Sequence, residues 1–183
     1  MLRVLLAALL LFASLASVSA SWTSRASTQK WWAITSSSDG TKLAATVQFG
    51  NIWTSTDSGE TWTSRASPQN WRGITSSSDG TKLAAVVYGR NIWTSTDSGE
   101  TWTSRASTQS WYEITSSSDG TKLAAVVYNG NIWTSWDSGE SWTSRATTQQ
   151  WVKITSSNDG TTLAATVYNG IIWTSTDSGE TWT

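Results

Sequence analysis

The chain has 183 residues, no cysteine or histidine, and a formal net charge of −1. The lack of these two side chains excludes disulfides, the usual catalytic triads and the usual zinc sites, and we expect no cofactor and no metal. No block of basic residues is present, so we expect no binding to nucleic acid or to an anionic membrane surface.

Residues 1–20 have the pattern of a secretory signal peptide. Arg3 supplies the positive start, residues 4–15 form an apolar stretch, and Val18-Ser19-Ala20 fits a cleavage site. A membrane anchor is the alternative, but the apolar run is shorter than the ~20 residues of a spanning helix. We therefore expect a secreted, extracellular protein that has no membrane insertion after cleavage behind Ala20.

Residues 21–183 form one domain built from a forty-residue unit, which fills 21–60, 61–100, 101–140 and 141–180 and leaves the partial strand 181–183. A fixed period of this length indicates a repeat architecture. Three of the fifteen tryptophans recur in each unit, as Trp22, Trp31 and Trp53 do in the first. Since an aromatic side chain buries ~150 to 250 Å², we interpret the repeated tryptophans as core residues.

Four strand signals follow one another within a unit, at 71–77, 82–88, 91–96 and 101–106. Asp79-Gly80 predicts a tight hairpin between the first two, and Asp97-Ser98-Gly99 predicts another between the last two. Four short antiparallel strands per ~40 to 45 residues are typical of β-propeller blades. The sequence therefore predicts an all-β β-propeller of about four blades. A β-solenoid is the alternative, which two hairpins in each unit disfavour.

Apolar residues occupy both alternating positions of these strands. Trp71 and Ile74 are an odd number of residues apart, so we expect them on opposite faces of one strand, and Ile92 and Trp93 likewise. A sheet with two apolar faces needs a cover on each face. Blades stacked face to face around an axis meet that need.

An octet beginning at residues 55, 95, 135 and 175 closes each unit. Its chemistry suits a turn: Asp97 can accept from backbone N–H groups, Gly99 has an unrestricted φ, and Trp102 can anchor the next strand. The octet resembles the Asp-box of the bacterial-neuraminidase-repeat, or sialidase-like, propellers, where the box forms the turn between the third and fourth strands of a blade. We assign a structural role to Ser55, Asp57, Gly59, Trp62, Ser95, Asp97, Gly99, Trp102, Ser135, Asp137, Gly139, Trp142, Ser175, Asp177, Gly179 and Trp182.

Three columns carry four different residues in the four copies, and all three flank the tryptophan that begins the first strand. Residues 48–50, 88–90, 128–130 and 168–170 form a second, weaker cluster. Both sets fall in connections on one side of an up-and-down blade, where binding surfaces are commonly built. Neutral drift is the alternative. The predicted ligand-binding residues are Lys30, Asn70, Ser110 and Gln150; Trp32, Arg72, Tyr112 and Val152; and Ala33, Gly73, Glu113 and Lys153.

A secreted, non-enzymatic binding module is the leading functional hypothesis. It is a lectin-like or protein-recognition propeller that binds a glycan or an extracellular protein surface through several similar sites. The resemblance also implies a sialidase-like glycoside hydrolase, or a degenerate fragment of one, as an alternative. A structural surface protein and a propeller like the photosystem II assembly factors are further alternatives.

Catalysis is disfavoured by the distribution of acidic and basic residues. The resemblance implies an arginine cluster, a Tyr/Glu nucleophile pair and an acid, but most arginines recur as part of the unit. Tyr112 and Glu113 are adjacent and point to opposite faces of a strand. Glu113 is the only acidic residue outside the repeated positions, so the pair of carboxylates that glycosidases need has no second member. We therefore expect no enzymatic activity.

Closure of the ring has three solutions. Residues 21–26 match a fourth strand and fit the blade that begins at Trp151, whose own fourth strand has only 181–183. The alternatives are an open arc and a homodimer whose two chains complete a ring of eight blades. A chain that ends inside a unit also fits a truncated protein.

Overall fold

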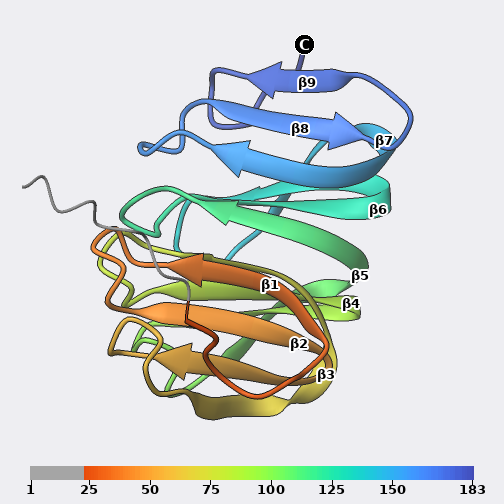
Figure 1. The fold of residues 1–183 in the computed structure, drawn as a ribbon. Helices are drawn as coiled ribbons and strands as arrows, with labels where there is room; N and C mark the ends of the chain where they lie inside the picture. The colour runs from red at the N-terminus through yellow and green to blue at the C-terminus, as the bar shows by residue number, and fades with distance from the viewer. Residues whose placement is uncertain (1–22) are drawn as a thin grey trace, which may run out of the picture.

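The computed structural model describes residues 23–183, and these contain strands and turns but no helix (Figure 1). The predicted signal peptide, residues 1–20, lies outside the described residues. Residues 23–183 therefore also lack a helix long and apolar enough to cross a membrane.

Nine strands follow one another, and each pairs antiparallel with the next along the chain. They are β1 (Trp31–Ser36), β2 (Leu43–Ser55), β3 (Thr63–Ser76), β4 (Leu83–Ser95), β5 (Thr103–Ser116), β6 (Leu123–Ser135), β7 (Thr143–Ser156), β8 (Leu163–Val167) and β9 (Ile172–Ser175).

The long strands β2, β4 and β6 each contain a hairpin. Phe49, Gly89 and Asn129, at the middle of these strands, all have a positive φ. In the fourth repeat the same stretch is two strands, and β8 pairs with β9 from Leu163 opposite Ser175 to Thr166 opposite Ile172. The strands predicted at 82–88 and 91–96 are therefore the two arms of β4.

The strands β3, β5 and β7 each join two sheets. The start of β3 pairs with β2 in one sheet, and its end, from Trp71 to Ser76, pairs with β4 in the next. The chain thus forms four sheets in sequence, here called blades A, B, C and D, which begin at Trp31, Trp71, Trp111 and Trp151. The predicted all-β architecture of four-stranded antiparallel blades is confirmed.

The tryptophan that begins the first strand of blades B, C and D fills the space between two blades. Trp71 is fully buried, and it packs with Ala44 and Ile52 of blade A and with Trp93 and Trp102 of its own blade. The Trp71 and Trp93 rings meet edge to face with centroids 6.4 Å apart, a favourable aromatic geometry. Trp111 and Trp151 repeat this arrangement. The repeated tryptophans thus form the core between blades.

The expectation that Trp71 and Ile74 lie on opposite faces is wrong. Both side chains belong to the same buried cluster, because the register between β3 and β4 shifts between them. Each first strand has such a β-bulge, in which one extra residue restores the face of the isoleucine. In blade C the extra residue is Tyr112, since Trp111 pairs with Val127 and Glu113 with Val126.

The octet forms the turn between the third and fourth strands of each blade. In blade B, Ser95 donates to the Asp97 carboxylate at 2.7 Å, and that carboxylate accepts the Thr101 N–H at 2.9 Å. Trp102 Nε1 donates to the Gly99 carbonyl at 3.0 Å. The turn also holds the neighbouring hairpin, because Ser98 N–H donates to the Thr81 carbonyl. The Asp97 carboxylate thus fixes its own turn, and a backbone hydrogen bond joins that turn to the hairpin at the same end of the blade.

Adjacent blades also meet along their first strands at this end. Ser38 N–H donates to the Ser78 carbonyl, Ser78 N–H to Ser118, and Ser118 N–H to Asn158, at 2.7 to 2.8 Å. A backbone hydrogen-bond chain therefore links all four blades, and it places the first strands together on the inner side of the arc.

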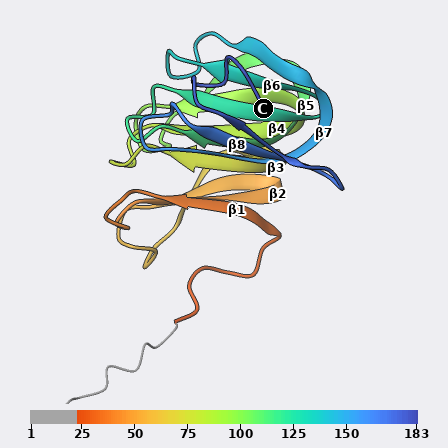
Figure 2. The same ribbon diagram turned by 90° about the horizontal axis from the view of Figure 1, so that it is seen from above.

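The four blades form an open arc (Figure 2). No residue of β1 or β2 comes within 8 Å, Cα to Cα, of β8 or β9. Two apolar faces are uncovered as a result: Ile34 is 66% exposed where its counterpart Ile74 is 6% exposed, and Ile172 is 67% exposed where Ile52 is fully buried.

Residues 23–26 lie beside blade A and do not complete blade D. Arg25 Nη2 is 3.9 Å from Glu60, as Arg65 is from Glu100. Ala26 has a φ of 61°, similar to the 49° of Ala66 in a true fourth strand. The prediction that the N-terminal strand closes the ring within one chain is therefore wrong for residues 23–26.

Gly99→Ala should destabilise the protein by about 2 to 4 kcal/mol, because φ is +86° and a Cβ would lie 2.8 Å from Thr54 Cγ2. Gly89→Ala, in the same blade, is the control: φ is +73°, but nothing lies within 4 Å of the added atom. We expect it to cost only the backbone strain, about 1 kcal/mol. Urea unfolding measures both, and equal losses would contradict the packing role of Gly99.

Candidate functional site

The three variable columns lie together at the start of the first strands. Asn70 pairs with Gln48, Ser110 with Tyr88 and Gln150 with Tyr128, so the columns are in direct register with the hairpin turns of the preceding blade. The structure thus brings the columns and the second variable cluster to one rim, opposite the octet turns. We call this surface the variable rim.

A row of stacked side chains crosses the variable rim from blade A to blade C. The Arg72 guanidinium lies 4.2 Å from the centroid of the Trp32 ring, 5.4 Å from that of Tyr88 and 5.8 Å from that of Tyr112. Tyr112 in turn stacks on Tyr128 at 5.7 Å. These five side chains form the aromatic row. Trp32 and Tyr88 are 45% and 37% exposed, so the row presents ring surface to solvent.

The bulge explains why these side chains meet. Trp32 and Tyr112 are the extra residues of their first strands, and Arg72 holds the same position in blade B. A bulge re-aims the side chain that it adds. The tryptophan before it is packed between blades, while the bulged residue remains at the rim.

Glu113 forms an ion pair with Lys153 of the next blade, and its other oxygen accepts the Ile114 N–H at 3.2 Å. The Glu113 side chain is only 15% exposed. Gly73 makes room for it, since a Cβ there would lie 2.3 Å from Glu113 Oε1. Gly73, Glu113 and Lys153 of the third column therefore lie side by side across blades B, C and D. The Glu113 carboxylate is paired with Lys153.

The remaining predicted residues stand apart from the aromatic row. Val152 is half-buried in the bulge of blade D and Lys30 is exposed beside blade A. Ala33 donates its N–H to Thr46 Oγ1 at 3.2 Å, which is a structural contact.

A groove opens on the variable rim at the seam of blades A and B, lined by Phe49, Ser67, Pro68, Gln69, Asn70, Arg90 and Trp93. A second groove uses corresponding positions of blades C and D: Asn129, Thr148, Gln149, Gln150, Val167, Tyr168, Asn169 and Gly170. Sequence reasoning singled out the variable positions but not the constant Gln69 and Gln149 beside them.

Residues 70–72, of which only Asn70 lines the first groove, contain polar atoms without a partner. Asn70 Oδ1, Trp71 Nε1 and Arg72 Nε are buried without a hydrogen-bond partner, whereas Trp111 and Trp151 donate to the carbonyls of Ser107 and Thr147. The repeat that carries Pro68 thus has three unpaired polar atoms in three consecutive residues.

Trp136 lies on the face opposite the variable rim, at an octet position where the repeat sequence changes. It is 50% exposed, and Arg145 lies 5.6 Å from its ring centroid. The other three octets have threonine at this position. Comparing the octets position by position is the signal that finds it.

No protein-family model and no curated protein matches the chain. Solved structures do match. The GH74 enzyme of Niastella koreensis is 24% identical with a TM-score of 0.69, over 84% of this chain and 24% of that one. YCF48 from Cyanidioschyzon merolae is 17% identical with a TM-score of 0.65, over 84% of this chain and 55% of that one. U3-55K is 13% identical with a TM-score of 0.71, over 87% and 52%.

The fold is a partial β-propeller. The chain spans about a quarter of the GH74 enzyme and about half of the other two structures. At these identities the likeness concerns the fold alone, and the chemistry of the variable rim has to be argued from its own residues.

We expect the protein to lose stability at low pH, because the aspartates of the octet turns have lowered pKa values in the folded state. Hydrogen bonds from the Thr101 hydroxyl and N–H, and from Ser95, lower the pKa of Asp97 from 3.8 to about 2. A depressed pKa in the folded state stabilises the fold above pH 3.8, and this stabilisation is lost as the pH falls toward 2. The free energy of unfolding should therefore be level down to about pH 4 and then decrease.

Asp97→Asn tests this attribution. The variant should be less stable than the parent at pH 7, and the difference should shrink between pH 4 and pH 2, because protonation removes the same charge from the parent. Urea unfolding across that pH range measures it. Parallel curves for parent and variant would contradict the role of the Asp97 carboxylate.

Proposed function

We propose that the protein is a secreted, non-enzymatic binding module of the Asp-box kind, which holds a glycan or an extracellular protein surface on its variable rim. The observation that carries this proposal is the aromatic row. Positions that differ in every repeat, from Trp32 through Arg72 to Tyr112, form one continuous surface over three blades.

Aromatic and arginine side chains are enriched where proteins bind partners. Neutral drift at exposed positions does not require the variable residues to contact one another. Here Arg72 stacks on both Trp32 and Tyr112. The row is also mounted on rigid strands, which lowers the entropy lost on binding. These features favour recognition over a surface-coating role.

The acidic residues support the non-enzymatic part of the proposal. Among the described residues, Glu113 is the only carboxylate outside the turns, and Lys153 already neutralises it. Hydrolysis of a glycosidic bond uses two carboxylates, one of them an acid with a raised pKa. The variable rim offers no second one.

A solved propeller supports a protein partner in particular. The structure of YCF48 bound to a D1 peptide is 16% identical with a TM-score of 0.56, over 87% of this chain and 69% of that one. Propellers of this kind thus bind protein partners. A lectin-like role draws its support from the exposed rings of Trp32 and Tyr88, which suit the apolar face of a sugar.

Replacing Trp32, Arg72 and Tyr112 together by alanine should abolish ligand binding and leave the fold intact, because none of the three belongs to a buried core cluster and only Tyr112 packs against one. Glycan-array and extracellular-protein-array binding measure the loss, and circular dichroism checks the fold. The control is Thr56→Ala with Thr96→Ala and Thr176→Ala, which are exposed on the opposite face. Equal binding by the triple rim variant and the parent would overturn the proposal.

We further propose that a second copy of the chain covers the two open faces of the arc. The outer face of blade D carries Ala164, Thr166 and Ile172, the counterparts of Ala44, Thr46 and Ile52 in blade A. Ala44 and Ile52 cover Trp71, and Thr46 donates its hydroxyl to the Arg72 carbonyl. The uncovered face of blade A carries Trp31 and Ile34, the counterparts of Trp71 and Ile74. Docking blade D on the partner's blade A therefore repeats a contact that the chain makes three times.

The residues before Trp31 fit the same assembly. They already lie where the fourth strand of a preceding blade would lie, with Arg25 near Glu60 and Ala26 at positive φ. Ile52 pairs with Arg65 in blade A, so Ile172 would pair with Arg25 of the second copy. The seam would also bring Val152 beside the second copy's Trp32 and extend the aromatic row.

Light scattering of residues 21–183 should give twice the mass of one chain. Ile34→Asp and Ile172→Asp should each give monomers that remain folded, because both side chains are exposed in the single chain and a buried charge at the seam is costly. Phe49→Asp is the control, since Phe49 is also 66% exposed but lies on the rim. A monomeric parent would overturn the second-copy proposal without touching the rim proposal.

A further inference from the structure

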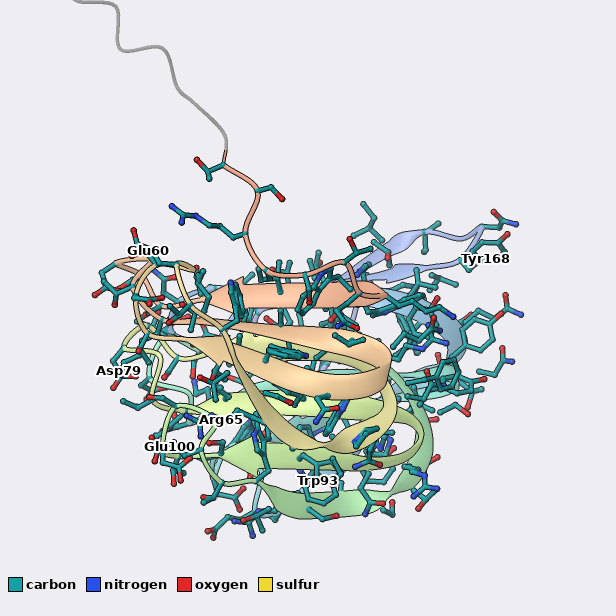
Figure 3. The ribbon with its side chains drawn as sticks, turned by 60° about the horizontal axis from the view of Figure 1, so that its bottom comes forward. Glu60, Arg65, Asp79, Trp93, Glu100 and Tyr168 are labelled. Atoms are coloured by element: carbon teal, nitrogen blue, oxygen red, sulfur yellow. The ribbon has the colours of Figure 1, made fainter. Side chains whose placement is uncertain are left out.

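The acidic residues are concentrated on one face of the arc. In Figure 3 Glu60, Asp79 and Glu100 lie at one edge of the molecule and Tyr168 at the opposite edge. All acidic residues but Glu113 belong to the turns at the first edge: Asp39, Asp57, Glu60, Asp79, Asp97, Glu100, Asp119, Asp137, Glu140, Asp159, Asp177 and Glu180.

The variable rim has the reverse balance. Lys30, Arg72, Arg90 and Lys153 are its basic residues, and Glu113 is its one carboxylate. Because charges of one sign on one face create a local potential that the net charge of −1 conceals, the rim is positive although the chain is not.

The basic residues away from the rim are mostly engaged with the acidic face. Arg65, Arg105 and Arg145 each lie 3.9 to 4.0 Å from a glutamate of the next octet. Lys42 and Lys122 donate to serines of neighbouring octets at 3.2 Å. These contacts hold blades together.

Arg72 and Arg90 have no such engagement. Neither belongs to an ion pair formed within residues 23–183. Arg72 is held between aromatic rings with its Nε buried and unpaired, so its guanidinium is fixed in place before any ligand arrives. Arg90 is exposed and lines the groove at the seam of blades A and B.

We propose that the variable rim binds an acidic oligosaccharide, with Arg72 and Arg90 holding its carboxylates; this rests on the binding function proposed above. Guanidinium groups bind carboxylates through paired hydrogen bonds. The exposed rings of Phe49 and Trp32 supply apolar surface for sugar faces. Gln69 and Asn70, which line the groove, supply amide groups for hydroxyls.

The recurrence of the groove is the reason to choose an oligosaccharide over a single acidic sugar, and the first groove is the one that contains an arginine. The groove at blades C and D again has two amide side chains, Gln149 and Gln150, and an exposed aromatic, Tyr168, at corresponding positions. Two similar grooves on one rigid rim match a ligand whose chemistry also repeats, and they gain affinity by acting together.

Isothermal titration of the protein with tetragalacturonate tests the proposal, with the neutral tetragalactose of the same linkage as the matched ligand. The acidic ligand should bind at least about tenfold more tightly, as expected for charge-assisted hydrogen bonds. This preference should shrink between about 0.05 M and about 0.5 M sodium chloride, because salt screens exposed charges.

Arg72→Gln and Arg90→Gln should each reduce binding of tetragalacturonate by at least about fivefold and leave tetragalactose unaffected. Arg90→Gln keeps the test valid if loss of the Arg72 stack disturbs folding. Lys122→Gln removes the same charge from the opposite face and should change neither titration.

Equal binding of the two tetrasaccharides would overturn the acidic-ligand proposal and leave the binding function standing. Binding of a carboxylate-rich peptide such as tetraglutamate, without binding of tetragalacturonate, would overturn the choice of a saccharide. Binding that the Trp32, Arg72 and Tyr112 triple alanine variant retains in full would overturn the proposed function itself.

Discussion

The fold depends on one repeated contact, the burial of a first-strand tryptophan between consecutive blades. Most neighbours in these strands are small, so a blade by itself buries little apolar surface. Trp71, Trp111 and Trp151 are fully buried only because the preceding blade covers them, while Trp31, which has no such cover, is 38% exposed. Stability is therefore a property of blade pairs, as in other repeat proteins.

The β-bulge next to that tryptophan allows two consecutive residues to have different roles. The tryptophan packs between blades, and the bulged residue after it lies on the variable rim. The tryptophan is held constant by its packing, and the residue after it is placed at the rim and is free to vary. This explains how Trp32, Arg72 and Tyr112 can differ completely in four copies of the same core. It also explains why they meet, since adjacent first strands lie together on the inner side of the arc.

Periodicity and turn chemistry were sufficient to predict the four blades, their hairpins and the rim on which the variable columns gather. They were not sufficient to predict which faces the side chains share. A strict alternation puts Trp71 and Ile74 on opposite faces, and only the register with β4 reveals the bulge that unites them. The Arg72 stack and the pairing of Glu113 with Lys153 cross between blades. Such contacts depend on the spacing of blades, which no single repeat encodes.

The same separation accounts for the electrostatics of the molecule. The turns need carboxylates, because Asp57 and its counterparts accept the N–H groups that the tight chain reversals leave unpaired. These four aspartates, the four of the hairpin turns at Asp39, Asp79, Asp119 and Asp159, and four glutamates lie at one edge and make that face negative for structural reasons. The rim carries no such requirement, so the charge of its residues is available to a ligand. The acidic ligand proposed above would therefore meet a positive rim opposite an acidic scaffold, and Arg72, held against aromatic rings without a carboxylate partner, would be a first contact for it.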